Sequence, residues 1–420
     1  MSDELPVYLF NLHVGVLQIA GDLRSPEDWR FTYDKNYLAQ KTPVAISVAL
    51  PLRNEVFEGA VVRNWFSNLL PEGAVRETIE KRLRLSSRDD FALLAAIGGE
   101  CAGAVSVGSG DNTIKVSAQD ETDLETLLYL QGNNAGDGAW AALGTPLRLS
   151  LAGAQDKIAV IRKSDGRLRL PAIGEASTYI LKPDSNHIRG IRDLEALGLA
   201  LAAAVSLRVA KAELTVVSGR NALLIERYDR QLLPDGSRIR LHQEDFCQAL
   251  GYPGELKYES QGGPSLANCA VLIRDQLRLG PAALQGFLDW VVFSALIGNA
   301  DAHAKNLSLL CGLDGRRKLA PLYDLIPILS IPESMVDRAP ALRIGRAERI
   351  DSISADDWQI FAAQTGYAPS FVLMRVKTLA NELMAKIEGV AKSLITQGAD
   401  EVQLHKSIMH IKKNIERMRY

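Results

Sequence analysis

The sequence is poor in cysteine, in long hydrophobic runs and in net charge. Its four cysteines lie far apart without a CxxC pair, which argues against a disulfide framework or a zinc site and favours reduced thiols in a cytoplasmic protein. We expect no membrane span, because no run of about 18 uncharged apolar residues occurs, and no secretory signal. A net charge of -2 argues against a surface covered with phosphate-binding cations, but it does not exclude a local basic patch.

The sequence does contain enough apolar material for a folded core. Its 420 residues are 47% hydrophobic and 23% charged, which is ordinary for a globular protein and excludes wholesale disorder. A chain of this length favours two or three domains.

Residues 1–110 are predicted to form a small α/β unit. Residues 7–19 indicate two short strands that meet at a turn, and residues 42–52 indicate a further strand. A single helix is expected over residues 64–85, because apolar side chains recur there at helical spacing. Residues 111–145 are weakly patterned and contain the turn-rich QGNNAGDGAW, and they are predicted to form a linker or flexible surface segment.

The rest of the chain is predicted to be strand-rich first and helix-rich afterwards. Strands are expected over 146–151, 157–162, 167–172 and 177–183, then a helix over 193–206 and a hairpin over 215–230 with Gly219 and Asn221 in its turn. Helices are expected over 264–279 and 281–298, a strand pair over 306–327, and two amphipathic helices with apolar faces over 372–394 and 404–418. This pattern indicates two lobes joined near residues 226–230.

The segment GNADAHAKNLSLL carries the most informative pattern. It places Asp301 and Asn306 five residues apart in a polar loop, and Asp324 follows after an expected hairpin. Phosphoryl transfer needs one carboxylate to orient the attacking hydroxyl, and an amide with a second carboxylate to hold Mg²⁺. Protein kinases use the same D-x-x-x-x-N spacing. His303 and Lys305 lie in between and could neutralise phosphate charge. The alternative is a polar turn that caps a helix.

Two further features fit a nucleotide site, although each has a simpler explanation. The loop SLAGAQDK, from Ser150 to Lys157, has small residues whose N–H groups could cradle phosphates. With Gly153 as its one glycine, it could equally be an ordinary hairpin connection. Lys182 lies in an apolar strand, where a buried ammonium needs a phosphate or carboxylate partner, and Glu195 follows on the next helix. A surface lysine that extends to solvent is the alternative.

The segment LLIERYDR ends an apolar strand at the junction between the lobes. Backbone groups of Glu226 and Tyr228 could hydrogen-bond the edge of an adenine there. Recognition through the backbone leaves little trace in a sequence, so a strand end with surface ion pairs explains the segment equally well.

Together these motifs resemble the HipA family, the kinase toxins of bacterial type II toxin–antitoxin modules. The resemblance rests on SLAGAQDK, YILKP, LLIERYDR, HQEDFCQALG, GNADAHAKN and PLYDLIP, which occur in the family's order across nearly the whole chain. It implies an α+β, two-lobed protein-kinase-like fold. An N-terminal subdomain would cover residues 1–110, the rest of the strand-rich lobe 111–228, and a helical lobe 229–420.

The resemblance also implies a role for each motif residue. Asp301 would be the catalytic base, with Lys182 and His303 assisting, and Asn306 and Asp324 would bind Mg²⁺. ATP would be bound by residues of the phosphate loop, the strand lysine, the hinge and the catalytic loop, namely Ala152, Gly153, Ala154, Gln155, Asp156, Lys157, Lys182, Glu226, Arg227, Tyr228, His303, Lys305, Asn306, Tyr323 and Asp324.

Regulation and partners follow from the same resemblance. Ser150 stands where such kinases autophosphorylate, and a phosphoserine there would be repelled by ATP phosphates, which would silence the enzyme; an unmodified strand-end serine is the alternative. The expected substrate is an aminoacyl-tRNA synthetase, whose phosphorylation arrests growth. The expected partner is a HipB-like helix-turn-helix antitoxin that binds operator DNA together with the kinase. A small-molecule kinase and a non-catalytic co-repressor stay open as alternatives.

Overall fold

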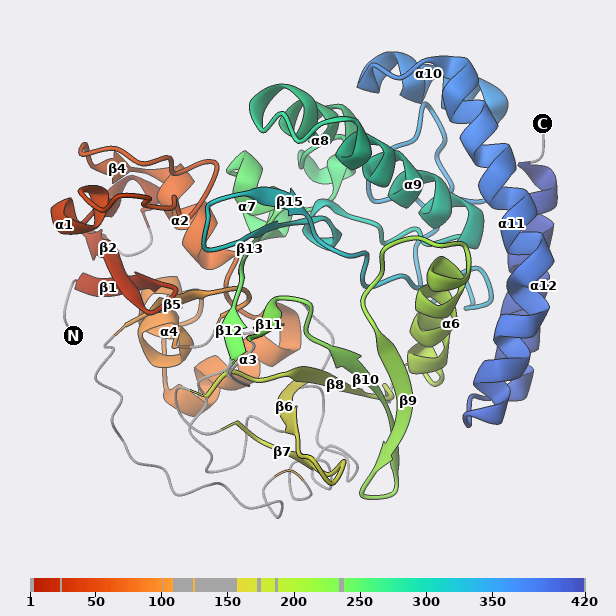
Figure 1. The fold of residues 1–420 in the computed structure, drawn as a ribbon, viewed down its shortest axis with the longest axis horizontal. Helices are drawn as coiled ribbons and strands as arrows, with labels where there is room; N and C mark the ends of the chain where they lie inside the picture. The colour runs from red at the N-terminus through yellow and green to blue at the C-terminus, as the bar shows by residue number, and fades with distance from the viewer. Residues whose placement is uncertain are drawn as a thin grey trace.

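The computed structural model describes residues 4–22, 25–99, 101–108, 124, 157–171, 175–185, 188–233 and 238–418. Within these ranges the chain folds as an N-terminal subdomain, a strand-rich lobe and a helix-rich lobe (Figure 1). Ser150, the phosphate-loop residues 152–156, the predicted strand 146–151 and the predicted linker apart from residue 124 lie outside them. No helix in the described part of the chain is long and apolar enough to cross a membrane.

The N-terminal subdomain is built on a five-stranded antiparallel sheet in the order β4-β3-β2-β1-β5. The hairpin predicted over residues 7–19 is confirmed. Its turn residues Phe10 and Asn11 both have positive φ, which matches the twist of paired strands. The strands are β1 (Glu4–Leu9), β2 (Leu12–Ile19), β3 (Trp29–Tyr33), β4 (Phe57–Glu58) and β5 (Val105–Val107).

Residues 42–52, predicted as a strand, form none in the structure. Their backbone groups bond to side chains instead of to a neighbouring strand. The Tyr33 hydroxyl accepts a hydrogen bond from the Ile46 N–H at 3.0 Å. The Glu244 carboxylate of the helix-rich lobe accepts one from the Val48 N–H at 3.1 Å. The segment therefore joins the subdomain to that lobe, which its apolar pattern could not indicate.

The single helix predicted over residues 64–85 is wrong, because the chain forms two helices there. Pro71 lies between them, and its ring and missing N–H disfavour helix at that point and at the residue before it. The helices of the subdomain are η1 (Pro26–Asp28), α1 (Lys35–Leu38), α2 (Ala60–Ser67), α3 (Gly73–Leu83) and α4 (Asp90–Ile97).

The strand-rich lobe has a second five-stranded sheet in the order β7-β6-β8-β10-β9, with α6 (Ile191–Ala204) packed against it. The predicted helix and hairpin are confirmed. The hairpin turn consists of Ser218 and Gly219, which have positive φ. Asn221 pairs with Val216 in the ladder, so its predicted place in the turn is wrong. The strands are β6 (Ile158–Arg162), β7 (Leu168–Arg169), β8 (Tyr179–Pro183), β9 (Ala212–Val217) and β10 (Arg220–Glu226).

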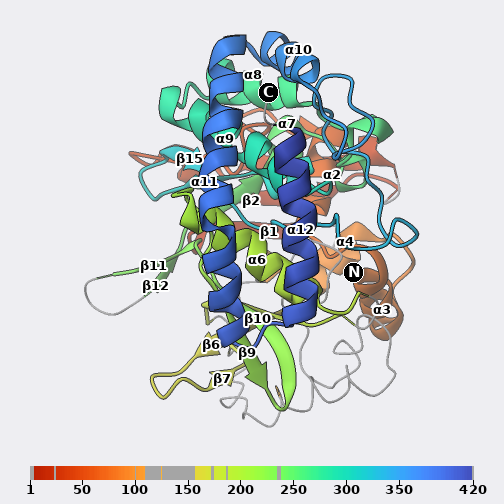
Figure 2. The same ribbon diagram turned by 90° about the vertical axis from the view of Figure 1, so that its right-hand side faces the viewer.

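The helix-rich lobe is organised around α9 (Pro281–Ile297), whose second half is fully buried. The two predicted amphipathic helices, α11 (Pro369–Thr396) and α12 (Glu401–Arg417), lie side by side and pack against it (Figure 2). Asp289 of α9 pairs with Arg375 of α11 at 2.5 Å, which compensates a charge inside this apolar helix.

Shorter elements complete this lobe. The helix predicted over 264–279 begins as α8 (Leu266–Val271) and continues as the π-helical turn η5 (Leu272–Gln276). The helix α10 (Ala355–Thr365) has no counterpart among the predicted helices. The remaining elements are β11 (Arg230–Leu232), β12 (Arg238–Arg240), β13 (His242–Asp245), α7 (Phe246–Leu250), η3 (Gly254–Leu256), η4 (Glu259–Gln261), α8 (Leu266–Val271), η5 (Leu272–Gln276), η6 (Ala304–Asn306), β14 (Ser308–Cys311), β15 (Arg317–Leu319) and α10 (Ala355–Thr365).

Candidate active site

Lys182, Glu195 and Asp324 meet at the junction of the two lobes. Lys182 Nζ lies 2.7 Å from Glu195 Oε1 and 3.1 Å from Asp324 Oδ1. Lys182 is on the central strand β8 and Glu195 is on α6, and both side chains are buried. The structure thus brings together a strand lysine, a helix glutamate and a loop aspartate, in the chain order that the sequence indicated.

Lys182 is stabilised as a cation by the two carboxylates, whereas Glu195 and Asp324 repel one another. Burial alone would lower the pKa of Lys182, but Asp324 and Glu195 outweigh it and raise that pKa above its usual range. Burial disfavours an ionised Asp324, yet Lys182 and Lys157 lower its pKa to about 2. Burial raises the pKa of Glu195, and Lys182 opposes this. The ammonium of Lys182 is therefore retained, and it is suited to bind phosphate oxygens.

The local backbone explains how Asp324 approaches Lys182. Asp324 has a left-handed φ of 56°, a conformation that aspartate adopts more readily than most residues. Gly198 of α6 makes room for this loop, because a Cβ there would lie 1.9 Å from the Leu325 carbonyl oxygen. The helix that carries Glu195 therefore packs directly against the loop that carries Asp324.

The loop after α9 orients Asp301 and Asn306. The helix ends at Ile297, and Gly298 after it has a left-handed φ of 74° that reverses the chain. Asn306 Nδ2 donates to the Asp301 carbonyl oxygen at 2.9 Å and closes the loop. Asn299 Nδ2 approaches the Asp324 carbonyl oxygen at 3.5 Å. The D-x-x-x-x-N spacing thus forms one compact loop that is joined to the loop of Asp324.

Asp301 is an exposed residue whose carboxylate is held by Tyr258. The Tyr258 hydroxyl donates to Asp301 Oδ1 at 2.9 Å. Partial burial of the carboxyl and the charge of Asp324 raise the pKa of Asp301 to about 6, while the Tyr258 hydrogen bond acts in the opposite direction. A carboxylate with this pKa can accept a proton from a hydroxyl near neutral pH. Sequence reasoning missed Tyr258, which lies in an irregular segment without a motif.

His303 is buried beside Tyr258, with the two rings edge to face and their centroids 5.5 Å apart. Burial and the charge of Lys257 lower the pKa of His303 to about 3. The imidazole is therefore neutral at physiological pH. The sequence allowed His303 to act as a cation or as a hydrogen-bond donor; the lowered pKa fits the donor, and its role toward phosphate stays a prediction.

Lys305 contacts the N-terminal subdomain. Its Nζ lies 2.5 Å from Asn68 Oδ1 and 3.3 Å from Glu72 Oε1. It also lies 3.3 Å from Asp245 Oδ2 of its own lobe. Asn68, Glu72 and Asp245 pair with the Lys305 ammonium within the protein, so a contact between Lys305 and ATP stays a prediction. Sequence reasoning missed Asn68 and Glu72, because no local pattern links them to a loop more than 200 residues away.

At the hinge, part of the backbone is used by the fold itself. The N–H groups of Glu226 and Arg227 donate to neighbouring backbone carbonyls at 2.8 and 3.0 Å. Among the described residues the Tyr228 N–H donates to no backbone carbonyl, so its predicted contact with an adenine edge stays a prediction. The Tyr228 ring lies 5.8 Å from that of Tyr323, whose hydroxyl bonds to the Lys305 carbonyl oxygen at 2.6 Å. The hinge and the catalytic loop are thus connected through Tyr323.

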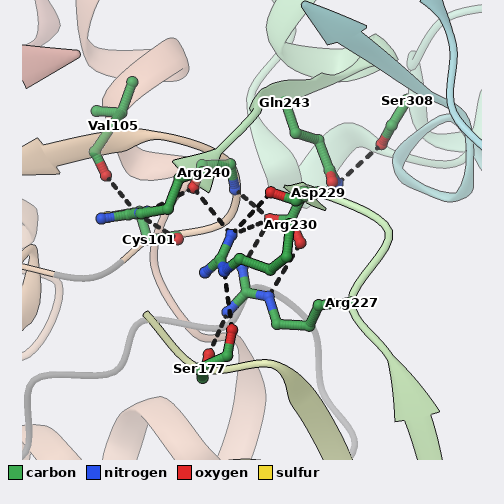
Figure 3. Close-up of polar contacts among 10 residues, drawn as sticks. Cys101, Val105, Ser177, Arg227, Asp229, Arg230, Arg240, Gln243 and Ser308 are labelled. Atoms are coloured by element: carbon green, nitrogen blue, oxygen red, sulfur yellow. Dashed lines mark hydrogen bonds and ion pairs between the residues drawn. The ribbon is translucent and has the colours of Figure 1, made fainter. Parts of the chain in front are cut away.

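A buried charge network beside the hinge joins the three parts of the molecule (Figure 3). Asp229 Oδ2 lies 2.7 Å from Arg227 Nη2 and 2.9 Å from Arg230 Nη1. Asp229 also accepts from the Gly103 N–H of the N-terminal subdomain at 2.9 Å. Arg227 Nη1 donates to Ser177 Oγ of the strand-rich lobe at 2.8 Å. The Arg227 side chain is therefore part of the hinge framework.

Lys157 is the one phosphate-loop residue that the structure describes, immediately before β6. Burial and the nearby charge of Lys182 lower the pKa of Lys157 to about 8. The two ammonium groups repel one another in the free protein, and a polyphosphate bound between them would relieve this repulsion.

Asn306 and Asp324 fit the chemistry of a magnesium ion, because both offer the oxygen ligands that Mg²⁺ prefers. The Nδ2 of Asn306 donates a hydrogen bond within its own loop, which leaves Oδ1 available as a ligand for a metal ion. Asp324 Oδ1 accepts a hydrogen bond from Lys182 Nζ, and the Asp324 side chain is 32% exposed. No group of three or more His, Cys, Asp or Glu side chains in the described ranges could hold a metal ion. Water and substrate phosphate oxygens would complete such a site.

Comparisons with known sequences define the family. The family model described as HipA N-terminal domain matches residues 5–108, and the model described as HipA-like C-terminal domain matches residues 149–392. The chain therefore belongs to the HipA family.

Individual relatives agree with this assignment. The chain is 38% identical over 372 residues to the proposed kinase Y4mE of Sinorhizobium fredii, with 87% of each protein covered. It is 30% identical over 338 residues to the serine/threonine-protein kinase toxin HipA of Shewanella oneidensis, with 76% of this chain and 74% of that protein covered.

A solved structure shows the same fold. The chain matches a chain from the complex of HipA, HipB and operator DNA of Shewanella oneidensis MR-1 with a TM-score of 0.80 and 23% identity, over 99% of this chain and 96% of that one. The two-lobed α+β kinase-like fold predicted from the sequence is thus confirmed.

Proposed function

We propose that this chain is a Mg²⁺- and ATP-dependent serine/threonine protein kinase of the HipA toxin type. The observation that carries the proposal is the meeting of Lys182, Glu195 and Asp324 beside the loop that holds Asp301 and Asn306. These are the groups that phosphoryl transfer requires for binding phosphate, for metal and for orienting the nucleophile. The kinase names of the relatives support the proposal.

In the proposed reaction Asp301 orients a serine hydroxyl and accepts its proton. The serine oxygen forms a bond to the γ-phosphorus of ATP while the bond to the bridging oxygen breaks, and ADP leaves. Lys182, held by Glu195, binds phosphate oxygens, and neutral His303 can donate a hydrogen bond to them. Mg²⁺ held by Asn306 and Asp324 would supply further charge neutralisation.

The proposal extends to regulation and partners. Ser150 would be autophosphorylated, and its added charge of about -1.5 to -2 would be repelled by ATP phosphates. A serine of an aminoacyl-tRNA synthetase is the proposed target, through which the kinase would inhibit translation and promote growth arrest. A HipB-like helix-turn-helix antitoxin and operator DNA are the proposed partners, supported by the Shewanella oneidensis complex that contains both.

Transfer of the γ-phosphate of ATP to proteins in a bacterial lysate tests the proposal. The wild-type chain should label a protein acceptor, and Asp301→Asn should lower the rate at least about 100-fold. The amide can still accept from Tyr258, so circular dichroism should show an intact fold. Equal labelling by both chains would contradict the proposal. Transfer to small molecules alone would favour the metabolite kinase, and operator binding without transfer would favour the co-repressor.

A further inference from the structure

Two residues of the N-terminal subdomain contact Lys305 of the candidate catalytic loop. Lys305 Nζ contacts Asn68 Oδ1 at 2.5 Å and Glu72 Oε1 at 3.3 Å. Lys305 lies between Asp301 and Asn306 in the chain, so these contacts connect that loop to a subdomain outside the two kinase-like lobes. The break between α2 and α3 at Pro71 is what places Asn68 and Glu72 there.

The contact surface is closely packed. Asn68 Nδ2 donates to the carbonyl oxygens of Asn64 and Tyr252, at 2.8 and 2.9 Å, which directs its Oδ1 to Lys305. A Cβ at Gly254 would lie 2.8 Å from Asn68 Oδ1, so no larger residue fits against this amide. Asn68 and Lys305 are both buried. The ammonium is therefore held in one place.

Glu72 bridges two segments of the site. Besides Lys305, it pairs through Oε2 with Lys257 Nζ at 2.9 Å. Lys257 directly precedes Tyr258, whose hydroxyl holds Asp301. Burial would raise the pKa of Glu72, but the two lysines outweigh it and lower that pKa to about 2. Glu72 is therefore ionised at any physiological pH.

Lys305 has a second carboxylate partner, which makes the role of Glu72 testable. Asp245 Oδ2, on the helix-rich lobe itself, lies 3.3 Å from Lys305 Nζ. Removing the charge of Glu72 thus leaves Lys305 with one anionic partner, so a folded variant is expected.

We propose that Glu72 is a positioning residue, which holds the catalytic loop through Lys305 and makes the N-terminal subdomain part of the phosphotransferase. This inference rests on the proposed kinase function for its catalytic consequence. The mechanical coupling between Glu72 and the loop can be tested without any activity.

Hydrogen–deuterium exchange of the full-length chain without nucleotide tests the coupling. The N–H groups of His303 and Asn306 are bonded within the loop and report its opening. Glu72→Gln should speed exchange in the peptide covering 301–307 by about tenfold. Glu77→Gln, at an exposed position on helix α3, which begins directly after Glu72, is the matched control and should leave this peptide unchanged. Unchanged exchange in folded Glu72→Gln would overturn the proposal.

A phosphoryl-transfer assay then tests the catalytic consequence of this coupling. Glu72→Gln should lower kcat about tenfold with KM for ATP within about twofold, and Glu72→Asp should recover part of the loss. Lys257→Met removes the other partner of Glu72 and should leave exchange at 301–307 close to wild type. If Lys257→Met reproduces the whole effect, the loop is held through Lys257 and the proposal fails. If the wild type transfers no phosphate, the proposed function fails, but the exchange result still decides the coupling.

Discussion

At the scale of single residues, two titratable groups of β13 link the helix-rich lobe to the N-terminal subdomain. Glu244 accepts from Ser47 Oγ at 2.7 Å, and His242 Nε2 lies 2.7 Å from the Ile46 carbonyl oxygen. Burial raises the pKa of Glu244 to about 7 and lowers the pKa of His242 to about 4. As the pH rises from about 4 to about 7, Glu244 lowers the stability of the folded chain and His242 raises it.

Whether each group adds or removes stability as the pH changes follows from the direction of its pKa shift. The raised pKa of Glu244 contributes stability below its ordinary pKa of 4.5, and this is lost as pH rises through about 7. The lowered pKa of His242 contributes stability above its ordinary pKa of 6.5, and this is lost as pH falls towards about 4. Glu244→Gln removes the first effect and leaves the second.

We therefore expect the free energy of unfolding of Glu244→Gln, relative to wild type, to increase by up to about 3 kcal/mol between pH 4.5 and 8. Urea unfolding at several pH values measures this difference. Glu77→Gln serves as an exposed control and should run parallel to wild type. If the curves of unfolding free energy against pH for Glu244→Gln and wild type run parallel, the Glu244 carboxyl keeps an ordinary pKa.

The sequence could predict some residue contacts but not others. The Lys182–Glu195 pair was predictable, because a lysine in an apolar strand needs an anionic partner and the next helix supplies one. The neutrality of His303 and the partners of Lys305 were not. The lowered pKa of His303 comes first from its burial and then from the charge of Lys257. The partners Asn68 and Glu72 of Lys305 are brought in by the fold from a distant segment.

At the scale of elements, the approach of α6 to the Asp324 loop depends on Gly198. Gly198→Ala would place a Cβ 1.9 Å from the Leu325 carbonyl oxygen, so the helix and the loop would have to separate. We expect a loss of about 2 kcal/mol or more in stability and a lower affinity for ATP, because Glu195 and Asp324 would no longer meet at Lys182.

Gly389→Ala is the matched control for this prediction. Gly389 lies on an exposed part of α11, and a methyl group added there would meet no atom within 4 Å. Alanine should therefore stabilise the helix by up to about 1 kcal/mol. Thermal unfolding and ATP titration compare the two variants. Equal behaviour of Gly198→Ala and Gly389→Ala would contradict the close packing of α6.

Elements with strong local patterns were predictable, and elements set by contacts between domains were not. The hairpins and the helices α9, α11 and α12 follow from apolar spacing and turn residues. The segment 42–52 has the composition of a strand, but Tyr33 and Glu244 satisfy its backbone groups. Over residues 64–85 the apolar spacing favoured one helix, although Pro71 was a sign of the break.

At the scale of the whole molecule, the Asp229 network joins the subdomain, the hinge and the strand-rich lobe. Asp229→Asn would leave the buried guanidinium groups of Arg227 and Arg230 without their carboxylate. We expect a loss of about 3–5 kcal/mol in the free energy of unfolding. Asp165→Asn removes an exposed pairing with Arg167 and should have no measurable effect. A chemical denaturation midpoint for Asp229→Asn equal to that of the control would contradict this role.

The most direct measurement of kinase activity is the intact mass of the purified, freshly dephosphorylated chain before and after incubation with Mg²⁺ and ATP. We predict that the wild type gains one phosphate, that peptide mapping places it on Ser150, and that Asp301→Asn gains none. A folded wild-type chain that binds ATP but gains no phosphate would contradict self-phosphorylation. An equal gain by Asp301→Asn would contradict the catalytic role of Asp301.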